Sequence, residues 1–70
     1  MMLKLTQSGK RHIPNKPHTM QAWGAIYLML RRHVVCTEEQ LLAVVPADNQ
    51  SYVRYAVRQG WLEEHVAVQQ

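Results

Sequence analysis

The polar residues best placed to do chemistry lie in the second half of the chain, between the turn signal at residues 46–49 and Gly60. Five of them follow helical spacing and would share the outer face of one helix: Gln50, Ser51, Arg54, Tyr55 and Arg58. Arginine can reach guanine edges or phosphates, glutamine can pair with adenine, and serine and tyrosine can reach phosphates. The pattern suits contact with DNA, although two arginines four residues apart also occur on ordinary solvated helix faces.

A second candidate contact lies near the N-terminus. Residues 1–17 hold no acid, whereas residues 18–70 carry four arginines against five acids. The whole chain has a formal charge of +3 and a pI of about 9.4. Cations that touch phosphates give a salt-dependent attraction to nucleic acid, and homeodomains use N-terminal arms in this way. The cations of the basic arm within this segment are therefore a second candidate DNA contact, with a solvated loop as the alternative: Lys10, Arg11 and Lys16.

Catalysis finds no support in the residue types or their spacing. Glu38 and Glu39 suit helix capping, Asp48 suits a turn, and no glycine-rich phosphate loop or paired nucleophile and base is present. His33 and Cys36 have the spacing of a ligand pair, but a structural zinc site needs four ligands. Cys36 is better interpreted as a small buried hydrophobe. We therefore expect neither an enzyme nor a bound metal or cofactor.

Four aromatic residues, Trp23, Tyr27, Tyr52 and Trp61, follow the apolar stripes of the sequence. This placement favours a role in the core. Stacking of these rings on single-stranded nucleic acid is a weaker alternative.

The length and composition favour one small cytoplasmic domain. A chain of 70 residues with 47% hydrophobic residues has enough apolar side chains for a single core. One cysteine allows no intramolecular disulfide, which fits a reducing compartment. No apolar run approaches the roughly 20 residues that span a bilayer, and the N-terminus lacks the apolar segment of a signal peptide. We expect no membrane association.

The apolar spacing and the turn residues predict a strand, an arm, three helices and a second strand. The first segment, residues 1–17, combines a short strand at 2–6 with the basic arm or loop at 7–17. Helix one is expected over 18–35, helix two over 37–45 and helix three over 49–60. The last strand is expected over 61–68.

Local signals mark the ends of helices two and three. Residues 37–40, Thr-Glu-Glu-Gln, match a capping box at the start of helix two, and Pro46 should end it. Asp48 or Asn49 is expected to cap helix three. Gly60 should terminate that helix as a glycine directly after its last turn.

Two short helices joined by a tight turn, the second ending in glycine and an apolar pair, resemble the small winged-helix regulators of bacteria and their phages. Those proteins share the pattern Thr-x-x-x-Leu-x-x-x-hydrophobic, matched here over residues 37–45. A recognition helix and a Gly-hydrophobic-Leu segment follow, matched by Val53, Val57, Gly60 and Leu62. The resemblance implies a mainly α domain with a small β element, a three-helix winged helix–turn–helix whose third helix enters the major groove.

The chain departs from this pattern at the wing, which is normally a hairpin of two strands. Residues 62–70 alone follow helix three, and they contain no turn signal. A reduced wing is therefore expected, with the last strand pairing with residues 2–6 instead.

Two functions are compatible with this reading. The first is a transcriptional regulator that binds double-stranded DNA through helix three and the basic arm, with a homodimer strengthening an otherwise small interface. The second is a protein-interaction module, either an adaptor or an inhibitor of a nucleic-acid-binding partner. The net charge of −1 over residues 18–70 and the reduced wing favour the second, and the fold alone does not choose between them.

Overall fold

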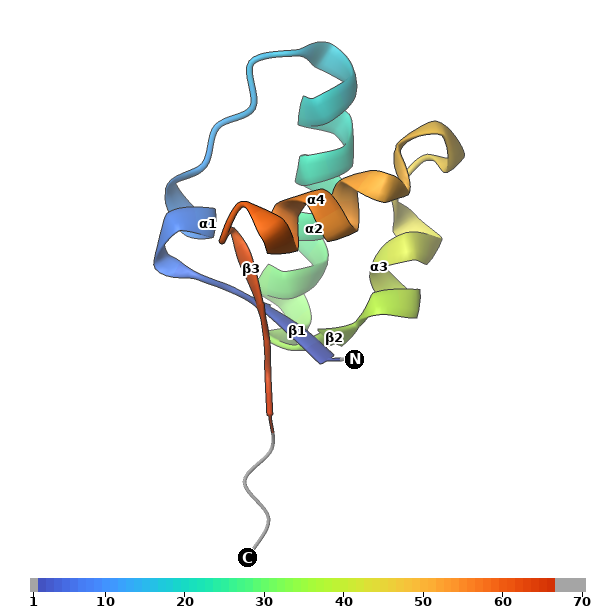
Figure 1. The fold of residues 1–70 in the computed structure, drawn as a ribbon. Coiled ribbons are helices and arrows are strands. Elements are labelled where there is room, and N and C mark those ends of the chain that lie inside the picture. The colour runs from blue at the N-terminus through green and yellow to red at the C-terminus, as the bar shows by residue number, and fades with distance from the viewer. Residues whose placement is uncertain (1, 67–70) are drawn as a thin grey trace, which may run out of the picture.

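Strands from near both ends of the chain meet in one small antiparallel sheet. The computed structural model describes residues 2–66 and places β1 (Met2–Leu5) between β2 (Cys36–Thr37) and β3 (Leu62–Glu64) (Figure 1). Leu3 lies opposite Cys36 on one side, and Lys4 lies opposite Glu63 on the other. The predicted pairing of the last strand with residues 2–6 is confirmed.

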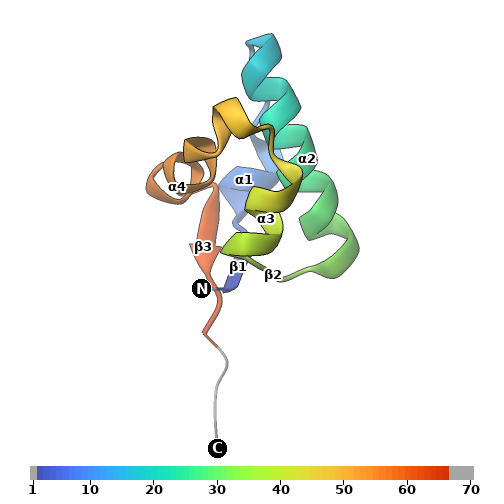
Figure 2. The same cartoon turned by 90° about the vertical axis from the view of Figure 1, so that its right-hand side faces the viewer.

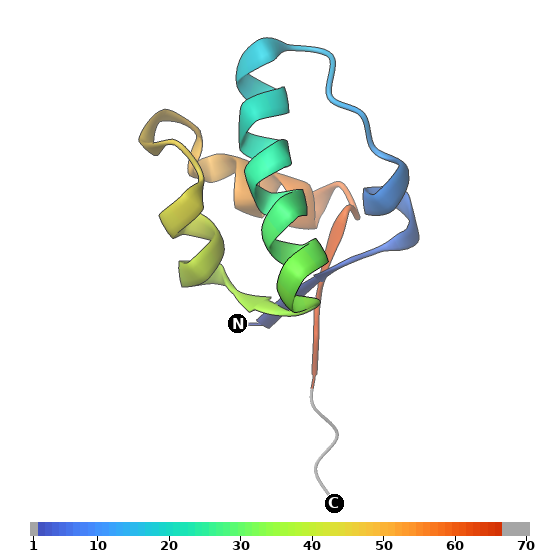
Figure 3. The ribbon, with the colours of Figure 1, turned by 180° about the vertical axis from the view of Figure 1, so that it is seen from behind.

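Helices make up most of the rest. They are α1 (Gln7–Arg11), α2 (Pro17–His33), α3 (Glu38–Val44), the 3-10 turn η1 (Ala47–Asn49) and α4 (Ser51–Arg58). Figure 2 shows α4 and α2 on opposite sides of the view, with α3 in front of them, and Figure 3 shows α2 in front of α4. The prediction of a mainly α fold with a small β element is confirmed.

The start and the end of α3 follow the predicted signals. The Thr37 side-chain oxygen accepts a hydrogen bond from the backbone N–H of Gln40 at 3.0 Å, and the Gln40 side chain accepts one from the Thr37 N–H at 2.8 Å. This is the reciprocal capping box. The helix stops at Val44 because Pro46 excludes its predecessor from helical backbone angles, and Val45 is extended with ψ 137°.

The predicted glycine terminator of α4 is confirmed, but the expected helix over 49–60 is too long at both ends, since α4 runs over Ser51–Arg58. Gly60 has φ +81°, and the N–H groups of Gly60 and Trp61 donate to the carbonyls of Val57 and Ala56, which forms a Schellman motif. At the start, neither Asp48 nor Asn49 caps the helix. The turn η1 runs directly into α4, so the N-cap residue Gln50 has helical backbone angles instead of the extended ones that side-chain capping needs.

The prediction of a loop over 7–17 is wrong for its first part, because residues 7–11 form α1. The Thr6 hydroxyl oxygen accepts a hydrogen bond from the Gly9 N–H at 2.9 Å and so caps this short helix. The Thr6 N–H donates to the Trp61 carbonyl at 3.0 Å, and the Thr6 hydroxyl donates to the Gly60 carbonyl. One threonine thus joins α1 to the turn between α4 and β3.

The predicted helix over 18–35 is too long at its C-terminal end and starts one residue late. Proline is favoured at the first helical position, so α2 begins at Pro17. It ends at His33, because Val34 adopts φ +66° and the Val35 N–H donates to the His33 carbonyl at 2.7 Å. This is a γ-turn with positive φ, a rare backbone that no local sequence signal announces.

The predicted strand over 61–68 is longer than β3. Trp61 belongs to the turn after α4, and the strand ends at Glu64. The His65 N–H still donates to the Met2 carbonyl at 2.8 Å, which extends the pairing by one hydrogen bond. Residues 67 and 68 of the prediction lie outside the described residues.

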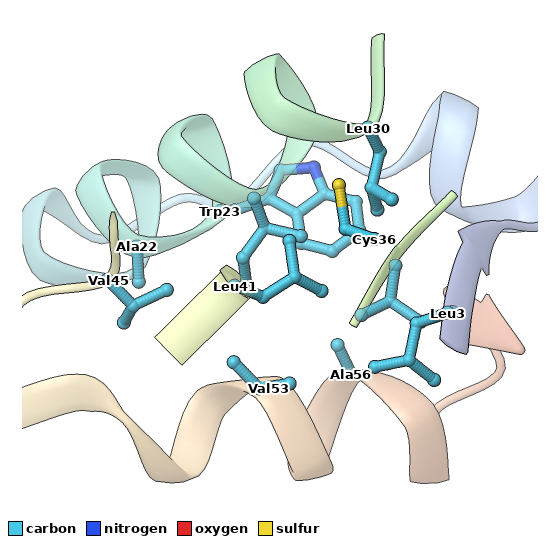
Figure 4. Packing of buried hydrophobic residues seen from close by; sticks show 11 residues of the cluster. Leu3, Ala22, Trp23, Leu30, Cys36, Leu41, Val45, Val53 and Ala56 are labelled. Carbon is cyan, nitrogen blue, oxygen red and sulfur yellow. The ribbon is translucent and has the colours of Figure 1, made fainter. Parts of the chain in front are cut away.

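The core lies between the sheet and the three longer helices (Figure 4). The largest fully buried side chains come from every one of these elements: Leu3, Ile26, Leu41, Val53, Leu62 and Cys36. The prediction that Cys36 is a small buried hydrophobe is confirmed. The aromatic prediction is also confirmed, since Trp23 is buried while Tyr27, Tyr52 and Trp61 pack against the core.

Two glycines should respond oppositely to the same substitution. A Cβ on Gly9 would lie 2.0 Å from the Trp61 carbonyl oxygen, whereas a Cβ on Gly24, exposed in α2, meets nothing within 4 Å. We expect Gly9→Ala to destabilise the protein by about 3 kcal/mol, because the backbone of one segment must move. Gly24→Ala should stabilise it by about 1 kcal/mol through higher helix propensity. Thermal unfolding of both variants checks this, and equal Tm values would contradict the close approach at Gly9.

Candidate nucleic-acid interface

The outer face of α4 carries the residues that the sequence singles out. Val53 and Ala56 point into the core, which turns the other side of the helix to solvent. All five predicted contact residues are exposed: Gln50, Ser51, Arg54, Tyr55 and Arg58. Helical spacing therefore brings them to one surface.

Within residues 2–66, two of these five side chains form hydrogen bonds to other elements, and the Tyr55 ring packs against Tyr52 and Trp61. The Arg54 Nε donates to a Glu38 carboxylate oxygen at 3.1 Å, and the Glu38 side chain is only 15% exposed. The Gln50 side-chain amide donates to the Leu42 carbonyl at 3.3 Å. Both contacts join α4 to α3. Arg58 is exposed and forms no ion pair within residues 2–66.

A mostly apolar hollow of about 240 Å³ lies beside the two arginines, between α4, the start of α3 and β1. Leu3, Val53 and Val57 line it, with Glu38, Arg54 and Arg58 completing the lining. The sequence gives no sign of this hollow, because β1 reaches it only through the sheet. It offers apolar contact next to positive charge.

The basic arm is held against the body by His12. Its ring stacks on Trp61 with centroids 3.4 Å apart and an interplanar angle of 16°, and its Nε2 lies 3.2 Å from the Tyr52 hydroxyl oxygen. Trp23 meets the same ring edge-on at 5.3 Å. The His12 imidazole therefore covers the Trp61 ring where a nucleic-acid base would otherwise stack.

The predicted cations of the arm do not line one common hollow, and Arg11 is exposed on α1. Lys16 lines a hollow together with Tyr52, Tyr55 and Trp61. Lys10 instead lines a hollow with Tyr27 and Arg31 on the α2 side of the molecule. Lys10 and Lys16 lie in different hollows because α1 turns the chain between Thr6 and His12.

The acid-free part of the chain extends well beyond the arm. Residues 1–37 contain no Asp or Glu, and all six of their Lys and Arg residues lie within the described residues: Lys4, Lys10, Arg11, Lys16, Arg31 and Arg32. All five acids follow, together with Arg54 and Arg58. A division of the charge at residue 17 hides the change after residue 37, where the first acid appears. A running sum of charge along the chain reveals it. Positive charge therefore belongs mainly to β1, α1 and α2.

The described residues contain no group of three or more His, Cys, Asp or Glu that could hold a metal ion. Cys36 is buried, which raises the pKa of its thiol, and its Sγ lies 3.7 Å from the Met29 carbonyl oxygen as a weak donor. Within residues 2–66, no helix has the length and apolar character needed to cross a membrane.

Comparison with known protein families, with curated proteins and with solved structures finds no match to this chain. A function must therefore be inferred from the surfaces of α4 and α2.

The His12 contact should make stability depend on pH. Burial lowers the pKa of His12 below its usual 6.5. As the pH falls below about 6.5, the unfolded chain takes up this proton before the folded one, so the free energy of unfolding decreases until the pH has passed the folded-state pKa. His12→Phe keeps an aromatic ring but cannot titrate.

Urea unfolding between about pH 7.5 and 5.5, where histidines titrate, checks this expectation. The stability of the wild type should fall over this range, and that of His12→Phe should fall less. Parallel curves for the two proteins would show that His12 does not carry the pH dependence.

Proposed function

We propose that this protein is a small DNA-binding protein that regulates transcription, with α4 as its recognition helix. The observation that carries the proposal is the arrangement of α3, η1 and α4. A capped helix leads through a tight turn into a second helix whose polar face is uncovered within residues 2–66. Helix–turn–helix proteins insert such a second helix into the major groove.

The proposal includes a winged-helix fold with an unusual wing. A standard wing is a hairpin that follows the recognition helix. Here β3 follows α4, and β1 takes the position of the second wing strand from the other end of the chain. This pairing supports a wing without its connecting turn, which explains why the sequence lacks a turn signal after Leu62.

The side chains divide into two roles. Gln50 and Ser51 lie at the N-terminal end of α4, where recognition helices contact base edges. Arg58 and Arg54 lie further along and suit phosphate contacts, and Lys16 lies beside Tyr55. Arg54 contributes less to DNA contact while its guanidinium is paired with Glu38.

Removing the charge of Arg58 should weaken binding to duplex DNA. We expect Arg58→Gln to lower the affinity for duplex DNA by about tenfold. The slope of log affinity against log salt concentration should decrease in magnitude by about one, as for the loss of one phosphate contact. The control is Arg32→Gln, which has the same charge change on α2 and should bind within about twofold of the wild type. Fluorescence anisotropy at several salt concentrations measures both, and equal losses would contradict a role for α4.

Releasing Arg54 should have the opposite effect. Glu38→Gln removes an acid beside α4 and frees the guanidinium, so we expect affinity for duplex DNA to rise about threefold or more. The control is Glu39→Gln, since Glu39 lies in the same first turn of α3, has the same charge and does not pair with Arg54. The proposal would be contradicted by equal effects of the two variants in the same titration.

A second candidate function, a protein-interaction module, is favoured by the apolar hollow beside α4. Leu3, Val53 and Val57 would take apolar side chains of a partner segment, and Arg54 and Arg58 would take its acids. Absence of duplex binding at about 50 mM salt, where phosphate contacts are strong, would favour this function over the first.

A further inference from the structure

A hollow lined by three cations lies where β1, α1 and the C-terminal part of α2 meet, and no residue of α4 lines it. Lys4 of β1, Lys10 of α1 and Arg31 of α2 surround it, and its volume of about 510 Å³ is roughly twice that of the hollow beside α4. No acid lines it. We call this the basic hollow. β1 and α1 follow one another near the N-terminus, whereas Arg31 lies near the end of α2, so the hollow forms only when the chain folds.

The Arg31 side chain is held in position at this hollow. Its guanidinium carbon lies 5.7 Å from the centre of the Tyr27 ring, and Nη1 donates to the Tyr27 hydroxyl at 3.4 Å. A cation ordered by an aromatic ring loses less side-chain entropy when it binds an anion.

The other two cations are accessible for an anion. Lys10 is exposed and forms no ion pair within residues 2–66. Lys4 pairs with Glu63 at 3.5 Å, but the two side chains are 41% and 53% exposed, and exposed pairs of this kind are weak. A phosphate can therefore compete for the Lys4 ammonium.

The lining suits a phosphodiester strand. Its cations match phosphates, and Leu5, Leu30 and Val34 add apolar surface for sugars. The two shorter dimensions of the protein are 23 and 22 Å. A duplex with a persistence length of about 150 base pairs cannot easily bend around a body of this size, so α4 and the basic hollow face two different segments.

We propose that the basic hollow binds the phosphate backbone of a second DNA segment, so that one protein molecule bridges two segments. The α4 side of this bridge rests on the function proposed above. The hollow itself rests on its own residues and needs no contact from α4.

A bridging assay tests this directly. One duplex is immobilised, the protein is added, and capture of a second, labelled duplex is measured. We expect Lys10→Gln/Arg31→Gln to lower capture by about tenfold while the immobilised duplex still retains most of the protein through α4. Matched single variants provide the control: Arg31→Gln should lower capture, whereas Arg32→Gln, with the same charge change on α2 outside the hollow, should capture like the wild type.

A further variant separates lost charge from lost packing. Lys10→Gln alone leaves the contact between Arg31 and Tyr27 intact and should lose part of the capture. Circular dichroism should show unchanged helix content in all variants, because the substituted residues are exposed.

Several results would overturn the proposal. The first is no capture by the wild type, and the second is full capture by the hollow variant, as a homodimer with two α4 sites would give. The third is an equal loss of capture in Arg31→Gln and Arg32→Gln. Polyglutamate displacing the second duplex from the hollow at a lower concentration than unlabelled DNA would assign the hollow to an acidic polypeptide instead. Arg58→Gln tests α4 separately: if it leaves retention unchanged while the hollow variant abolishes it, the recognition-helix proposal fails and the hollow remains as a DNA site.

Discussion

The junction at Thr6 is the constraint on which the rest of the structure depends. Its N–H donates to the Trp61 carbonyl, and its hydroxyl both donates to the Gly60 carbonyl and accepts from Gly9. These bonds continue the pairing of β1 with β3 and begin α1. A small domain buries little surface, so joining segments that are distant in sequence contributes strongly to its core. Leu3 and Leu62 are fully buried as part of the same sheet.

The junction also decides where the charged residues lie. Because Thr6 caps α1 and Gly9 packs against Trp61, Lys10 is directed to the α2 side, and His12 stacks on the Trp61 ring. Lys16 then reaches the other side, near Tyr55. The acid-free first half of the chain thus supplies cations to both faces, while Glu38 restrains one of the two arginines of α4.

The two proposed DNA contacts differ in what holds them. The α4 face is a regular helix whose exposure follows from burial of Val53 and Ala56, so its residues are placed by helical periodicity. The basic hollow is made by β1, α1 and α2 together, and its geometry depends on the sheet. An extended duplex can reach one face at a time, because α2 and α4 lie on opposite sides of a narrow body (Figure 2).

The sequence by itself determined the features that depend on near neighbours. The capping box at Thr37, the stop at Pro46 and the glycine terminator at Gly60 are contacts within a few residues, so the bounds they mark could be predicted. The spacing of Val53 and Ala56 likewise placed the polar face of α4. Hydrophobic alternation also indicated that residues 2–6 form a strand.

Only the tertiary structure decided what depends on distant partners. The helix α1 exists because Thr6 and Gly9 meet Trp61, the pair of Arg54 with Glu38 spans two helices, and the basic hollow joins three elements. Each of these contacts links residues far apart along the chain. Periodicity and local capping carry no information about such contacts, which arise when the core and the sheet bring the segments together.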